Sequence, residues 1–347
     1  MRALLARERI TLDTADQPVN MPFGVVLSNN GETLYVINAG SNDLSIIDLA
    51  SGRAVGHVSV GANPRGIAIA PDGSRVFVNN VLDGSVTVVD TASNSVETTI
   101  PVSDIPLTPQ VLLDKKFFNS SLEPKLSMDN WISCAVCHFD GTTDQRTWLG
   151  FPDGRRTTPS LLGVSETLPV HWSGDLDELA DVELTIRVIQ AGAGLINGEA
   201  SGSLGTKHAG RSEDLEALVA YLETLEIGDS PVPRITPAIN SGQRVCDDLG
   251  CAICHGAPLF TDHRAHDVGT GDPRTERNRH DRGTAFDTPS LRGLWATAPY
   301  LHDGTAPALA DVFTTDTSTH NVLDRTSCDG RDDLLAFLFS LPWRPNA

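Results

Sequence analysis

Two short segments of the sequence place cysteine and histidine at a spacing that suits covalent attachment of a cofactor. Residues 134–138 read CAVCH and residues 251–255 read CAICH. In a CxxCH segment the two thiols can add to the vinyl groups of a haem, and the following histidine can bind the iron. The sequence therefore predicts two covalently bound haem c groups, held by Cys134, Cys137, His138, Cys251, Cys254 and His255.

Two other kinds of site use closely spaced cysteines. A thioredoxin-like redox pair needs a βαβ context, which the sequence around the motifs does not provide. A zinc site built from the four motif cysteines would leave both adjacent histidines unused. The two-residue gap on a helical turn, in contrast, sets both sulfurs along one porphyrin edge and the histidine under the iron. The haem interpretation is favoured, and it predicts redox chemistry.

The two motifs head two related halves of the chain. Residues 158–164 (TPSLLGV) match residues 288–294 (TPSLRGL) without a gap, at an offset of 130. Each half ends in an amphipathic helix with acidic residues at its start, where the helix dipole favours them, expected over residues 212–222 and 332–338. We therefore expect two mainly α-helical, class I cytochrome c-like domains, at residues 106–230 and 231–347.

A different repeat occupies the first part of the chain. Residues 22–60 align with residues 64–102 at an offset of 42, and each unit reads as four short strands separated by Gly, Asn and Asp turns. This period fits one β-propeller blade, and residues 34–38 (LYVIN) resemble the signature of YVTN-type propeller repeats. We expect residues 1–105 to form about two blades. Two blades cannot close a ring, so further N-terminal blades or closure by another chain is expected.

Composition limits the partners. The chain has 26 basic and 45 acidic residues, a formal net charge of −19, which disfavours nucleic acid. It favours a basic electron-transfer partner, or simply keeps the protein soluble. No run of 18 apolar residues predicts a membrane span. The first residues are too few and too charged for a signal peptide, whereas bacterial haem attachment occurs outside the cytoplasmic membrane. We therefore expect a periplasmic or otherwise extracytoplasmic protein with a truncated N-terminus.

Residues 110–347 resemble the di-haem cytochrome c peroxidase and MauG-like family. Residues 286–304 (FDTPSLRGLWATAPYLHDG) closely match the family's signature around the second haem. In the first half, residues 171–174 (HWSG) resemble a segment that ends in Trp-Asp-Gly, although Ser173 replaces the Asp. Fusion of propeller repeats to such domains is also familiar. The resemblance thus covers the two predicted cytochrome domains.

The resemblance implies a peroxidase mechanism. The second haem would collect electrons from a small donor protein, a cytochrome c or a cupredoxin. The first haem would bind hydrogen peroxide at an open sixth position, and a tryptophan between the haems would carry the electron. Trp172 matches that tryptophan, with core packing as its alternative role. A calcium ion between the domains would also fit the family, although no acidic cluster specifies it.

Cleavage of peroxide also needs a base and a polar partner beside the distal oxygen. Glu199 is our candidate for this role. No motif decides between it and the other polar side chains available, which are Gln145, Arg146, Arg155 and Arg156.

The sixth ligand of each haem decides its chemistry. No methionine follows Cys251, so a second haem ligated from its own domain cannot be His/Met. The candidates are His320, His302 and Tyr300, the last because MauG-like members use tyrosine. His320 is preferred, since His302 belongs to the family signature and is expected to line the haem pocket without binding iron. Tyr300 is also expected to contact the cofactor. For the first haem, residues 139–170 contain no histidine, so its site is either open or closed by His171 or His208.

The remaining cysteines and the overall function leave alternatives. Cys246 and Cys328 are expected to form a disulfide in an oxidising compartment, or to remain buried free thiols. The leading function is reduction of hydrogen peroxide. A closed, six-coordinate first haem would instead favour a di-haem electron carrier. The missing methionine ligand favours a third reading, MauG-like oxidation of a protein or organic substrate.

Overall fold

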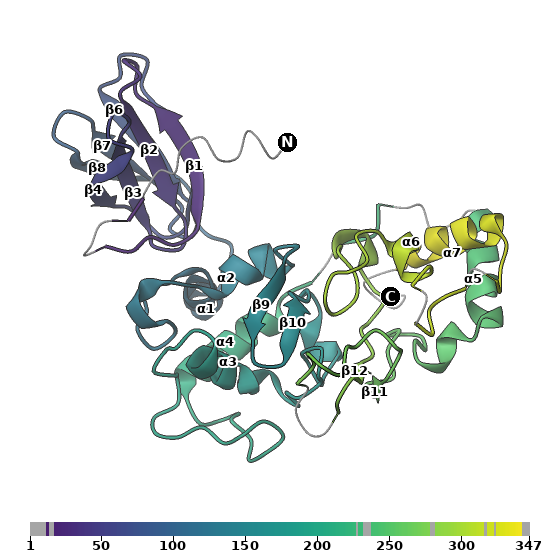
Figure 1. The fold of residues 1–347 in the computed structure, drawn as a ribbon. Coiled ribbons are helices and arrows are strands. Elements are labelled where there is room, and N and C mark those ends of the chain that lie inside the picture. Colours follow the sequence, from purple (N-terminus) through teal and green to yellow (C-terminus); the bar gives the residue numbers. More distant parts are fainter. Residues whose placement is uncertain are drawn as a thin grey trace. The chain divides into compact units, whose positions relative to one another are not determined.

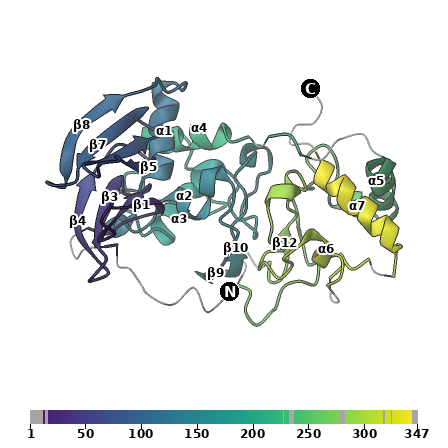
Figure 2. The same ribbon diagram turned by 90° about the horizontal axis from the view of Figure 1, so that it is seen from above.

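The computed structural model describes residues 12–13, 17–226, 228–231, 237–277, 282–315, 318–322 and 324–341. The chain divides into two compact units, drawn as ribbons in Figures 1 and 2. The first unit contains residues 1–136, 183–198 and 211–221, and the second contains residues 137–182, 199–210 and 222–347. The three-domain division at residues 105 and 230 stays a prediction, because compactness groups the chain differently from sequence repeats.

The first unit begins with two four-stranded antiparallel sheets of identical topology, with the strands in sequence order. The first sheet contains β1 (Pro22–Leu27), β2 (Thr33–Asn38), β3 (Asp43–Asp48) and β4 (Arg53–Ser59). The second contains β5 (Pro64–Ile69), β6 (Arg75–Asn80), β7 (Ser85–Asp90) and β8 (Ser95–Pro101). Two propeller-like blades, as the repeat predicted, are therefore present.

The repeat also governs the interior of the two sheets. Asn38 donates its side-chain amide to the Ser45 hydroxyl at 2.8 Å, and Asn80, 42 positions later, donates to the Thr87 hydroxyl at 2.8 Å. All four residues are buried, and a buried amide is stable only when it is hydrogen-bonded. The core is formed by β-branched and aliphatic side chains on the alternating inward positions, including Ile37, Leu44, Val76, Val78 and Val89.

Helices complete the first unit. Helix α1 (Pro109–Asn119) begins at Thr108, whose hydroxyl accepts from the Val111 amide, and has proline in its first turn. Helices α3 (Val182–Val188) and α4 (Glu213–Glu223) follow, and α4 confirms the first predicted amphipathic helix. Phe118 of α1 packs edge-on against Tyr221 of α4 with ring centroids 5.2 Å apart.

The second unit is mainly helical and irregular, with two small two-stranded antiparallel sheets. Its regular elements are β9 (Thr147–Phe151), β10 (Gly154–Thr157), α5 (Pro237–Asp248), β11 (Ala265–His266), β12 (Phe286–Asp287), α6 (Leu309–Val312) and α7 (Cys328–Ser340). Helix α7 contains the second predicted amphipathic helix and packs closely against α5 (Figure 1). Gly242 allows this approach, because a Cβ there would clash with the Asp333 carbonyl.

The offset of 130 residues is visible in the backbone of the second unit. Short 3-10 helices occur at Val164–Glu166 and Leu294–Ala296, each preceded by a glycine in the left-handed region. Isolated bridges join Val170 to Leu176 and Tyr300 to Ala306. The fold class predicted from the sequence, a propeller-like segment followed by cytochrome c-like helical repeats, is confirmed. None of the helices in the described ranges is long and apolar enough to span a membrane.

Candidate haem sites

The histidines of the two CxxCH motifs are oriented in the same way. His138 Nδ1 lies 3.0 Å from the Pro159 carbonyl, and His255 Nδ1 lies 3.1 Å from the Phe260 carbonyl. A carbonyl can only accept, so each Nδ1 carries the proton and each Nε2 is the metal-binding nitrogen. Burial lowers the pKa of His138 to about 4 and also lowers the pKa of His255. Both rings are thus neutral, which is the form that binds iron.

The motif cysteines lie on short helical turns, as attachment requires. Cys134 and Cys137 bound the one-turn helix α2 (Cys134–Cys137), and Cys251 begins the 3-10 helix Cys251–Ile253. The Cys134 sulfur accepts a weak hydrogen bond from Gln190 Nε2 at 3.6 Å, and burial raises the pKa of the Cys134 thiol. The residue types and orientations in both motifs therefore fit covalently bound haem.

Cys246 has a different partner from the one predicted. All six cysteines are free thiols, so of the two alternatives for Cys246 and Cys328 the structure has free thiols and not the disulfide, with Cys246 buried and Cys328 exposed. Helix α5 turns Cys246 into the core, where its thiol is hydrogen-bonded to that of Cys251. That hydrogen bond lowers the pKa of Cys251 to about 7. Cys328 is exposed at the start of α7 and accepts from Arg331 Nη2 at 3.1 Å.

His320 faces the second proximal histidine. The ring centroids of His255 and His320 are 6.4 Å apart. With metal–imidazole bonds of about 2 Å, two imidazoles on opposite sides of one ion have centroids roughly 6 Å apart. The other two candidates are engaged elsewhere: the Tyr300 hydroxyl donates to the Leu294 carbonyl at 2.7 Å, and His302 Nε2 bonds Glu276 at 3.0 Å. The geometry therefore favours His320 as sixth ligand.

Trp172 and His302, from the two sequence repeats, meet within the second unit. The Trp172 indole N–H donates to the Thr157 carbonyl at 3.0 Å. The His302 ring lies edge-on to the indole, with centroids 6.4 Å apart, and stacks on Phe286 at 3.9 Å. His302 is buried and Trp172 is half-buried. The indole is thus fixed at one edge by a hydrogen bond and packed against a neutral aromatic cluster.

Glu276 connects this cluster to a buried cation, and the sequence did not predict it. One carboxylate oxygen lies 2.8 Å from Arg156 Nη1 and the other lies 3.0 Å from His302 Nε2. The Arg156 guanidinium also lies 5.5 Å from the centre of the Phe286 ring. Arg156 was only one of several polar candidates, and its burial in this ion pair gives it a structural role.

A Glu276→Gln variant should lower the free energy of unfolding of the haem-loaded protein by about 3 kcal/mol, because it leaves the buried Arg156 charge without its carboxylate. Denaturant unfolding measures the change. The matched control is Asp272→Asn, which removes a carboxylate from the exposed pair with Arg274 and should leave stability unchanged. Equal effects of the two substitutions would contradict a special role for the buried pair.

Three further residues predicted for the first haem site do not form one cluster in the structure. Glu199 is exposed, so its acid–base role stays a prediction. His208 is fully buried with both ring nitrogens occupied, Nδ1 by Asp181 at 2.6 Å and Nε2 by the Ser201 hydroxyl at 3.1 Å. This disfavours His208 as an iron ligand. His171 is exposed and bonds Asp175 at 3.0 Å.

Asp287 adds a buried carboxyl beside the tryptophan. Its backbone amide donates to the Trp172 carbonyl at 2.8 Å, whereas its side-chain Oδ1 is buried without a hydrogen bond. Burial raises the pKa of Asp287 to about 7, against the opposing effect of the nearby Arg282. The sequence offered no signal for this residue beyond its place in the family-like signature.

The Asp287 carboxyl predicts a pH effect on stability. Its folded-state pKa is above the ordinary value of about 4, so the native protein holds the proton more tightly than the unfolded chain. The associated stability is complete below about pH 4 and is lost as the pH rises through 7. Relative to wild type, Asp287→Asn should therefore gain up to about 4 kcal/mol between pH 4 and pH 8. Unfolding curves across this range test it, with the exposed Asp177→Asn expected to show no such trend.

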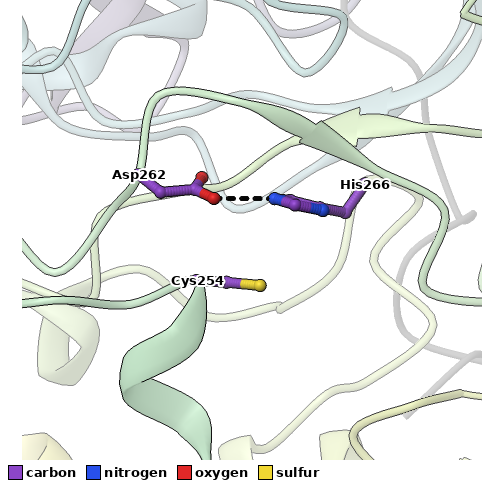
Figure 3. A group of neighbouring side chains, drawn as sticks. All are labelled: Cys254, Asp262 and His266. Atoms are coloured by element: carbon purple, nitrogen blue, oxygen red, sulfur yellow. Dashed lines mark hydrogen bonds and ion pairs between the residues drawn. The ribbon is translucent and has the colours of Figure 1, made fainter.

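One further cluster combines metal-ligating atoms. Figure 3 shows His266 and Asp262 pointing toward each other, with the Cys254 sulfur nearby. His266 Nε2 lies 2.7 Å from Asp262 Oδ2, and one ligand atom of each of the three residues lies within 4.8 Å of the others. Cys254 is predicted to become a thioether, which is a poor ligand for hard ions. The arrangement is therefore better explained as an Asp–His pair next to the attachment motif.

Comparisons with known proteins agree with this picture. Residues 10–111 match the family model "Lactonase, 7-bladed beta-propeller", and residues 285–320 match "RoxA-like, cytochrome c-like". The methylamine utilization protein MauG of Methylorubrum extorquens is 29% identical over 255 residues, covering 60% of this chain and 69% of the relative. Hydrazine synthase subunit gamma of Kuenenia stuttgartiensis is 28% identical over 255 residues, covering 58% and 69%.

Two more matches have the same character. Cytochrome c551 peroxidase of Nitrosomonas europaea is 25% identical over 231 residues, covering 56% of this chain and 69% of the relative. Among solved structures, a MauG-like protein associated with microbial copper homeostasis has a TM-score of 0.49 and 21% identity, covering 70% of this chain and 91% of that one.

The chain is thus similar to MauG and to cytochrome c peroxidases over more than half of its length, and its first part is similar to β-propeller blades. It is an oxidoreductase, and covalently bound c-type haem is its cofactor.

Proposed function

We propose that this chain reduces hydrogen peroxide to water with electrons from a small redox protein, a cytochrome c or a cupredoxin. The observation that carries the proposal is the unequal surroundings of two equally oriented histidines. His255 faces His320 across a gap that suits one metal ion. The histidine near His138 is His171, which is exposed and bonds Asp175, and no ring in the described ranges is paired with His138 as His320 is with His255. His255 and His320 would therefore hold one haem from both sides, whereas the site at His138 would accept a small ligand.

The haems supply the one-electron redox chemistry, and the protein positions the path between them. His138 and His255 would hold the iron through Nε2, because their Nδ1 protons are held by carbonyls. The Trp172 indole N–H is held by the Thr157 carbonyl, which is too weak a base to remove its proton. An electron can therefore cross Trp172 without a coupled proton transfer. Two electrons and two protons convert one peroxide into two waters.

Acidic surface charge supports the choice of partner. The formal net charge of −19 would attract a basic donor protein and accelerate its encounter at low ionic strength. Thioether attachment also supports an extracytoplasmic location, most simply the periplasm. Calcium stays a prediction of the family resemblance.

MauG-like oxidation of a protein or organic substrate is the second candidate. It is favoured by the absence of methionine after Cys251, together with the position of His320. Histidine in place of methionine lowers the reduction potential of a haem, which makes it a weaker acceptor for electrons from high-potential donors. Such a haem is better suited to share oxidising equivalents with a nearby substrate.

The test is to express the chain with a haem-attachment system and an export signal, then to record optical and EPR spectra of the oxidised and half-reduced protein. A high-spin ferric signal from one haem that disappears with peroxide supports an enzyme. Steady-state turnover with a reduced cytochrome c then distinguishes peroxidase from MauG-like chemistry. Two low-spin haems indifferent to peroxide in both redox states would leave only an electron carrier.

A paired substitution sharpens this experiment. Replacing Cys134 and Cys137 with serine removes covalent attachment at the first motif, and the equivalent change at Cys251 and Cys254 removes it at the second. Only the first pair should abolish the peroxide-sensitive signal. If only the Cys251/Cys254 substitutions abolished the signal, peroxide would bind at the second motif, contrary to the proposal.

A further inference from the structure

The second attachment motif has a third thiol beside it. Cys246 lies in the last turns of α5, is only 7% exposed, and belongs to the apolar core of the second unit. After α5 the chain reverses through Gly250, which has a φ of 79°. The reversal returns Cys251 to the same apolar core, where it packs against the cluster that contains Cys246 and its side chain is hydrogen-bonded to the Cys246 thiol. The first-position sulfur of this motif therefore pairs with Cys246.

The first motif provides an internal comparison. Its first-position sulfur, on Cys134, contacts the Gln190 amide at 3.6 Å. The six cysteines of the chain are the four motif cysteines together with Cys246 and Cys328, and Cys328 contacts Arg331. Only the second motif, therefore, has an additional cysteine, Cys246, beside its first cysteine. A buried thiol in sulfur–sulfur contact needs little movement to reach disulfide geometry.

We propose that Cys246 is a redox partner of the second motif: in the haem-free chain it forms a disulfide with Cys251, which must be reduced before the second haem is attached. The oxidant is a protein disulfide of the thiol-oxidase class. Exchange joins the Cys246 and Cys251 sulfurs, and their two electrons and two protons convert that disulfide to a dithiol. A dithiol reductant reverses the step. Addition of each motif thiol to a vinyl group involves no net redox change, so Cys251 must first be a thiol.

This disulfide leaves Cys254 as a thiol, whereas the usual internal pairing of a CxxC segment would consume both motif cysteines. The buried Cys246 would thus shield Cys251 from wrong pairing while the chain waits for haem. The inference rests on the assignment of Cys251 to haem attachment, which the same experiment checks separately.

The test uses the full chain, exported in hosts with and without haem-attachment machinery. Free thiols are blocked with N-ethylmaleimide under acid quench, and the protein is cleaved on the amino side of aspartate. Because Asp247, Asp248 and Asp262 are cleavage points, Cys246 falls in one peptide, and Cys251 and Cys254 fall together in another. Mass spectrometry then identifies each link.

The expected result for the haem-free chain is a disulfide between the two peptides, located at Cys251 by fragmentation, with Cys254 blocked by the reagent. In the haem-loaded chain the second peptide should carry haem and Cys246 should be blocked. Cys246→Ser should remove the link, and the control Cys328→Ser should retain it. In the haem-free wild-type chain, a Cys251–Cys254 or Cys246–Cys328 disulfide would overturn the proposal, as would finding Cys246, Cys251 and Cys254 all blocked as free thiols. These outcomes do not depend on whether the serine variant folds. Absence of haem from the loaded peptide would instead count against the haem assignment.

Discussion

A His320→Ala variant will convert one of the two haems from six-coordinate and low-spin to high-spin. The expected cause is loss of the imidazole that faces His255 with a centroid separation of 6.4 Å. Optical and EPR spectra of the oxidised protein measure the change. In a companion variant, His320→Met, the reduction potential of that haem should rise by an amount on the order of 0.1 V. This is a modest part of the ~0.8 V range that axial ligands span.

Tyr300→Phe is the matched control for His320. It removes the hydrogen bond from the Tyr300 hydroxyl to the Leu294 carbonyl but leaves the His255–His320 pair in place. Its spectra should match those of wild type. Unchanged spectra in His320→Ala, combined with altered spectra in Tyr300→Phe, would make the tyrosine the ligand and would bring the second haem closer to the MauG pattern.

The second large effect is expected from Trp172→Phe. Phenylalanine has a higher oxidation potential than tryptophan and lacks the N–H that anchors the indole to Thr157 at 3.0 Å. We expect turnover with peroxide and a reduced donor protein to fall at least about 100-fold, equivalent to about 2.7 kcal/mol in the activation barrier. The lost hydrogen bond should cost only about 1 kcal/mol of folding stability. Steady-state kinetics and denaturant unfolding separate the two effects.

Trp148→Phe is the control, because Trp148 also donates its indole N–H, to Asp144 at 2.9 Å, and lies in the same unit. It should lose a comparable amount of stability and keep its turnover. The relay role would be rejected if both variants retained turnover, or if Trp172→Phe lost it only through failure to bind haem, which the haem absorbance would reveal.

The sequence alone predicted the features that depend on short motifs and internal repeats. The CxxCH spacing, the 42-residue blade period and the 130-residue repeat each depend on residues close in the chain or on direct self-similarity. The preference for His320 followed from elimination, since no methionine was available, and the ring geometry now favours it. Such inferences are possible because residue type and spacing alone restrict the chemistry.

Features that depend on long-range closure were missed. Glu276 is 120 positions from Arg156, in a loop where several charged residues look alike, and only the fold selects the one that is buried. The contact of Cys246 was missed for a different reason. The pairing with Cys328, one of the two alternatives that the sequence left open, ignored the rotation of α5 and the reversal at Gly250, which turn the Cys246 thiol toward Cys251. Gly250, two residues after the end of α5 and four residues beyond Cys246, was an available but unused signal.

The carbonyl anchors of His138 and His255 restrict how the two centres can diverge during evolution. Pro159 and Phe260 present main-chain oxygens, and these persist through any substitution that keeps the local backbone path. Side-chain substitutions at these positions do not remove the hydrogen-bond acceptor or change its charge. They would do so if an aspartate side chain held the histidine. Changes in reactivity are therefore expected on the side of each haem site that lies opposite the anchored histidine. There, replacement of a single residue such as His320 can change the chemistry and leave the anchored histidine in place.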